Sequence, residues 1–125
     1  MNTVQQGPTS EANAIHTSGS CHCGEIEYTI DGPMLKQSYC DCAACRKATG
    51  ALKVPFVTVR QASLTVTKGE PSTVRGSTDG GCDQHGSWRF CPACGTNLFW
   101  VPDEGDQIDV LAGALDDVSL FRVED

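Results

Sequence analysis

Eight cysteines, most of them gathered into short clusters, constrain this chain more than any other feature of its sequence. They form a C-x-C pair, a C-x-C-x-x-C group, a single cysteine and a C-x-x-C pair: Cys21/Cys23, Cys40/Cys42/Cys45, Cys82 and Cys91/Cys94. Such close spacing lets one turn present two sulfur atoms to one metal ion. The length of 125 residues suits a single domain. Only 39% of the residues are hydrophobic and 6% aromatic, so bound metal would add stability to a domain with a small core.

The surroundings of the cysteines favour metal ligands over disulfides. The first 18 residues, MNTVQQGPTSEANAIHTS, have neither the basic start nor the apolar stretch of an export signal. No run of about 18 apolar residues is present, so we expect no membrane span. We therefore expect a cytoplasmic protein, because clustered cysteines in that reducing compartment are typically metal ligands or catalysts.

The chain is acidic, with a formal net charge of −7 and a sequence pI of about 4.7. Proteins that bind nucleic acids usually present a basic face to the phosphates. The charge therefore argues against a nucleic-acid partner.

Short β-strands separated by glycines dominate the rest of the sequence. Ile26, Tyr28 and Ile30 alternate with polar residues, which predicts a half-buried strand. Further strands are expected over 35–39, 54–59, around 64–66 and 74, and over 88–90, 97–101 and 108–111. Residues 43–48 predict one or two helical turns that end at Gly50. Residues 1–18 lack apolar periodicity, which predicts a flexible tail. The predicted strands that follow indicate one mainly β domain over residues 19–125 with very little helix.

The two outer cysteine pairs predict a structural zinc site. In the C-x-x-C pair, Pro92 stiffens the turn, and Gly95 lets backbone N–H groups point at sulfur. Cys21 and Cys23, also followed by a glycine, are the natural second half of a four-thiolate site. The competing interpretation of Cys91 and Cys94 is a redox dithiol, which needs a βαβ context that the sequence does not show.

The central group, Cys40, Cys42 and Cys45, offers three ligands without a fourth nearby. Three protein ligands and one open position are typical of a catalytic zinc, here one that holds a thiol as its thiolate. The alternatives are a second structural site completed by Cys82 or His85, or a set of reduced thiols. Arg46 and Lys47 directly follow Cys45 in the sequence. They are interpreted as cations that bind the substrate or, more simply, as part of a solvated helix face.

Taken together, these motifs resemble the glutathione-dependent formaldehyde-activating enzyme family, which shares its domain with centromere protein V. The resemblance runs through GSCHCG at 19–24, YCDCAACRK at 39–47 with Gly50, RFCPACGTNL at 89–98 and AGALDD at 112–117. The set covers nearly all of the chain from residue 19 to about 117.

The resemblance implies a mainly β, Mss4-like fold of short, twisted antiparallel sheets held together by zinc. It implies two zinc ions: a structural one on Cys21, Cys23, Cys91 and Cys94, and a catalytic-type one on Cys40, Cys42 and Cys45. The family activity joins glutathione and formaldehyde into S-(hydroxymethyl)glutathione, which is a carbon–sulfur lyase reaction read in reverse. We therefore expect a zinc-dependent carbon–sulfur lyase that acts on a thiol such as glutathione. The alternative is a non-enzymatic zinc module that mediates protein interaction; chromatin binding fits poorly with the acidic pI.

Overall fold

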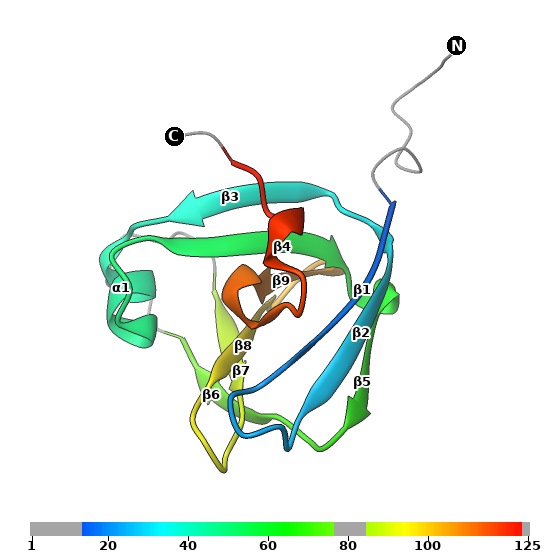
Figure 1. The fold of residues 1–125 in the computed structure, drawn as a ribbon. Helices are drawn as coiled ribbons and strands as arrows, with labels where there is room; N and C mark the ends of the chain where they lie inside the picture. The colour runs from blue at the N-terminus through cyan, green and yellow to red at the C-terminus, as the bar shows by residue number, and fades with distance from the viewer. Residues whose placement is uncertain (1–13, 77–84, 124–125) are drawn as a thin grey trace.

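The fold consists of two antiparallel sheets, as the computed structural model in Figure 1 shows for residues 14–76 and 85–123. The smaller sheet has the order β1-β2-β5, with β1 (Ala14–Ser20), β2 (Glu27–Pro33) and β5 (Leu64–Lys68). The larger sheet has the order β3-β4-β9-β8-β7-β6, with β3 (Lys36–Cys40), β4 (Val54–Arg60), β6 (Ser72–Arg75), β7 (Gly86–Phe90), β8 (Asn97–Pro102) and β9 (Gln107–Leu111). The strands expected from the sequence are thus confirmed.

One α-helix, α1 (Ala43–Thr49), lies among the described residues. It ends at Gly50, whose φ of +81° is left-handed and favours glycine, so the predicted stop is confirmed. The remaining helical segments are single 3₁₀ turns: η2 (Gln61–Ser63), η3 (Ala112–Ala114) and η4 (Val118–Leu120). Within the described parts of the chain, no helix has the length and apolar character needed to cross a membrane.

The main core fills the space between the two sheets. Ile26, Tyr28 and Ile30 are each at most 1% exposed, whereas the intervening Glu27 is exposed, which confirms the predicted alternation. They belong to one buried cluster with residues of the larger sheet, among them Val57, Val59 and Val110. The opposite face of β4 carries Val54 and Phe56, which belong to a second cluster around Cys45. Strand β4 therefore connects the main core with the central cysteine group.

The predicted flexible tail is wrong for residues 14–18, because they form most of β1. This strand pairs with β2 in continuous register from Ala14 opposite Pro33 to Ser20 opposite Glu27. The Ser18 hydroxyl also donates to Asp116 Oδ2 at 2.6 Å. An edge strand is held largely by backbone hydrogen bonds, which leave little trace in a hydrophobic pattern. Residues 1–13 of the predicted tail lie outside the described part of the chain.

Candidate metal centres

Two hairpin ends, one from each sheet, form the first candidate metal centre. Residues 21–26 connect β1 to β2, and residues 91–96 connect β7 to β8. In the first turn the Cys21 N–H donates to the Ile26 carbonyl at 3.1 Å. The second repeats this bond, from the Cys91 N–H to the Thr96 carbonyl at 3.0 Å. Each cysteine pair is therefore set by a short turn that its hairpin holds in place.

A glycine completes each turn. Gly24 and Gly95 have φ values of +82° and +83°, which side-chain-bearing residues rarely adopt. Their N–H groups donate to the carbonyls of Cys21 and Cys91 at 3.2 and 2.7 Å. The glycine that follows each cysteine pair thus allows the chain to curl around the sulfur atoms.

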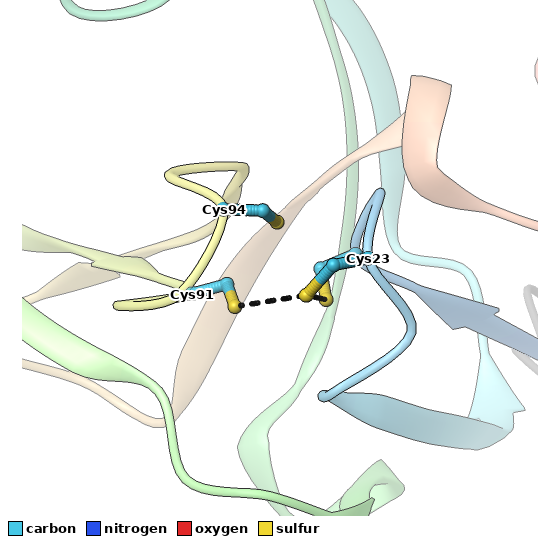
Figure 2. Close-up of side chains that lie close together, drawn as sticks. Cys23, Cys91 and Cys94 are labelled. Carbon is cyan, nitrogen blue, oxygen red and sulfur yellow. Dashed lines mark hydrogen bonds between the residues drawn. The ribbon is translucent and has the colours of Figure 1, made fainter.

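The sulfur atoms of the two turns converge at distances that suit tetrahedral zinc (Figure 2). The sulfur of Cys23 lies 3.7 Å from that of Cys21 and 3.8 Å from that of Cys91. Including Cys94, all four atoms lie within 4.8 Å of one another. A tetrahedron with Zn–S bonds of about 2.3 Å has edges of about 3.8 Å. All four residues are free cysteines, so the predicted ligands of the structural site are together and the donor set fits zinc.

Hydrogen bonds to sulfur support this arrangement. The Ile26 N–H donates to the Cys21 sulfur at 3.3 Å, and the Cys94 sulfur lies 3.2 Å from Thr96 Oγ1. The hydrogen bond with the Thr96 hydroxyl lowers the pKa of Cys94 to about 5, which favours the thiolate form. Thr96 Oγ1 also accepts from the His22 N–H at 3.1 Å, which joins the two turns directly. Metal ligands are commonly oriented by such surrounding hydrogen bonds.

The second candidate centre is built from a strand end and the first turn of a helix. Cys40 ends β3, Cys42 caps α1 and Cys45 lies within α1; their sulfur atoms all lie within 4.8 Å of one another. The Cys40 sulfur donates to the Cys42 sulfur at 3.4 Å, and the Cys45 N–H donates to the same sulfur at 3.4 Å. Burial raises the pKa of Cys45 to about 12. The residues that bury it are apolar: Val54, Phe56 and Trp88.

The oxidation state of Cys42 decides whether this second group can bind metal. In this structure the sulfur of Cys42 is part of a disulfide, and a metal ligand must instead be a thiolate. Binding by all three sulfur atoms therefore requires the reduced form. Of the two proposed fourth ligands, Cys82 lies outside the described residues. His85 is described, directly before β7, and belongs to neither metal-competent group.

Arg46 and Lys47 are exposed on α1. The Arg46 Nε donates to the backbone carbonyl of Asp41 at 3.1 Å. This placement fits a solvated helix face, and a role of either residue in substrate binding stays a prediction.

A cleft of about 400 Å³ lies between the two cysteine groups, and sequence reasoning did not predict it. Cys21 and His22 line it on the side of the first group, and Val54 and Leu111 belong to the cluster around the second. Asn97 also lines it and ties the β7–β8 hairpin to α1, since its Nδ2 donates to the Ala48 carbonyl at 3.0 Å. The lining comes from widely separated segments, so no local motif could reveal it.

Comparison with known proteins agrees with the fold described above and with the family that the cysteine motifs indicate. A family model described as glutathione-dependent formaldehyde-activating enzyme matches residues 16–124. No curated protein sequence matches the chain significantly. The crystal structure of a Rhodobacter sphaeroides protein superposes with a TM-score of 0.60 at 24% identity, over 79% of this chain and 87% of that one. The predicted mainly β, Mss4-like fold is confirmed.

Proposed function

Because this chain belongs to the glutathione-dependent formaldehyde-activating enzyme family, we propose that it is a zinc-dependent carbon–sulfur lyase that captures a low-molecular-weight thiol. The observation that carries this proposal is the division of seven cysteines into one group of four and one of three. Four thiolates close a tetrahedral site, whereas three leave a coordination position for a substrate.

The group of four takes the structural role. Thiolates are soft donors that select zinc, and zinc in a closed four-sulfur site adds folding energy rather than reactivity. Cys21 and Cys23 come from the hairpin of the smaller sheet, and Cys91 and Cys94 from a hairpin of the larger one. A metal held by all four therefore ties the two sheets together at one end of the core.

The group of three takes the thiol. In the reduced form Cys40, Cys42 and Cys45 would hold a zinc ion, which would supply a positive charge that favours the thiolate form of an added thiol. Cys45 is 7% exposed, so the apolar side chains around it exclude water from one side of the site. The N–H of Cys45 keeps the Cys42 sulfur in place. Strand β3 and helix α1 with its cap thus position three ligands, which would leave one coordination position of the metal open.

The proposed reaction balances with the thiolate, formaldehyde and water alone. In the direction of synthesis, the thiolate sulfur forms a bond to the carbon of formaldehyde, and the C=O π electrons move to oxygen. That oxygen takes a proton from water, which gives the S-(hydroxymethyl) adduct. In the lyase direction the hydroxyl group returns its proton to the hydroxide left from that water, the C=O π bond re-forms, and the carbon–sulfur bond breaks with its electron pair going to sulfur.

Calorimetric titration of the reduced, zinc-loaded protein with 2-mercaptoethanol and with glutathione tests this proposal. We expect about one thiol to bind per chain and to release a proton, because metal-bound sulfur is deprotonated. Titration in two buffers of different ionisation enthalpy measures that proton. Cys42→Ser should abolish the binding, whereas the control Cys82→Ser should retain it.

A protein that holds two zinc ions and gives neither heat nor proton release would contradict thiol capture. That result would favour the non-enzymatic module, in which both zinc ions are closed by protein ligands. Loss of binding in Cys82→Ser would show that this cysteine belongs to the second site.

A further inference from the structure

Among the described residues, none of those that line the cleft between the two cysteine groups is a Lys, Arg, Asp or Glu. All nine lysines and arginines of the chain fall within the described residues, so none is left to enter it from elsewhere. Most of them have partners outside the cleft: Arg46 with the Asp41 carbonyl, Lys53 with the Tyr39 ring, Arg60 with Asp106, Lys68 with the Gly24 carbonyl, Arg75 with Asp103, Arg89 with Ser87 and Arg122 with the Ser119 carbonyl.

The position of the cleft links it to the second cysteine group. Val54, which lines the cleft, is the register partner of Cys40 and packs in the same cluster as Cys45. Ala51 and Leu111 also line the cleft and pack against that cluster. When the sulfur of a thiol binds at the second cysteine group, the rest of the thiol is therefore next to the cleft.

The lining itself indicates the kind of ligand. Its volume of about 400 Å³ lies toward the small end of the range for ligand sites, which is roughly 300–1,000 Å³. Apolar residues such as Ala51, Val54 and Leu111 form much of the surface, and Ser20 and Asn97 add groups that can form hydrogen bonds. This combination suits a short carbon chain that bears hydroxyl groups.

Glutathione fits this surface poorly. It carries two carboxylates, and burying a carboxylate without a cation or a set of hydrogen-bond donors is costly. The net charge of −7 adds a general repulsion of anions. From a lining that offers no lysine or arginine to an anion, and from the position of the cleft, we infer that the thiol bound here is small and uncharged, and that its carbon chain lies in the cleft. This inference rests on the proposed capture of a thiol at Cys40, Cys42 and Cys45.

The test compares 1-thioglycerol, which is uncharged, with 3-mercaptopropionate and glutathione in calorimetric titrations of the reduced, zinc-loaded protein. Affinities are corrected for the different thiol pKa values. We expect 1-thioglycerol to bind at least about tenfold more tightly than either anion, a difference of about 1.4 kcal/mol.

Gly113→Lys adds a cation to the cleft, and Gly113→Gln is its uncharged control. A Cβ at Gly113 would have nothing within 4 Å, and its φ lies outside the left-handed region, so both variants should fold. In Gly113→Lys we expect the preference for 1-thioglycerol over 3-mercaptopropionate to fall about fivefold or more, because an opposite charge nearby favours the anion. In Gly113→Gln the preference should stay as in the wild type.

Each outcome of these titrations has one meaning. Binding of glutathione as tightly as 1-thioglycerol by the wild type would overturn the inference, even though thiol capture would stand. Equal effects of Gly113→Lys and Gly113→Gln would show that the ligand does not occupy the cleft. Failure of every thiol to bind would instead overturn the proposed function.

Discussion

Replacing Cys94 with serine should lower the melting temperature sharply and remove one equivalent of zinc per chain. The Cys94 sulfur is one of four that lie within 4.8 Å of one another, and the metal they bind would join the two sheets. Structural zinc contributes roughly 10 kcal/mol or more to the folding of small domains. That is comparable to the whole free energy of unfolding of a typical domain, which is about 5–15 kcal/mol. Circular dichroism on heating and elemental analysis measure the two effects.

Cys42→Ser is the matched control, because it makes the same chemical change in the other cysteine group. In the reduced protein it should remove the second zinc but leave most of the stability, since the ligands of that group come from a single stretch of chain, from the end of β3 to the first turn of α1. A Cys94→Ser protein with full zinc content and an unchanged melting temperature would contradict the structural role of the first group.

Deleting residues 1–18 should also destabilise the protein strongly. The deletion removes most of β1, which pairs with β2 along its whole length, and the Ser18 hydrogen bond to Asp116. At about 1 kcal/mol for each backbone hydrogen bond, the loss is several kcal/mol. One kcal/mol corresponds to roughly 4–8 °C for a domain near 100 residues, so the melting temperature should fall by more than about 10 °C.

A deletion of residues 1–13 separates the contribution of β1 from that of the preceding residues. The melting temperature of this shorter deletion serves as the reference for the longer one. Equal melting temperatures for the two deletions would show that β1 contributes nothing measurable to stability.

Local features of the sequence predicted much of the fold and which cysteines come together in the first candidate metal centre. The alternation at Ile26, Tyr28 and Ile30 arises because one face of this segment is buried. Gly50 stands at the end of α1 because the backbone there is left-handed. Likewise, Gly24 and Gly95 follow the cysteine pairs because the turns require positive φ. In each case the physical cause acts within a few residues, so a short stretch of sequence shows it.

Features that depend on distant parts of the chain were missed. Strand β1 is polar because it lies at a sheet edge and is held by backbone bonds, so it looked like a tail. The cleft joins residues as far apart as Ser20 and Ala114, and no pattern along the chain links them. Neither residue of the basic pair after Cys45 lines the cleft, and a role of either in substrate binding stays a prediction.

X-ray absorption at the zinc edge, on the reduced and zinc-loaded protein, most directly tests the claim that the chain holds two different zinc sites. One site with four sulfur ligands and one with three average to about 3.5 sulfur atoms per zinc at about 2.3 Å, with the remainder oxygen or nitrogen. Adding the thiol that binds should raise this average to about four. An average of four before the thiol is added, unchanged afterwards, would contradict the account.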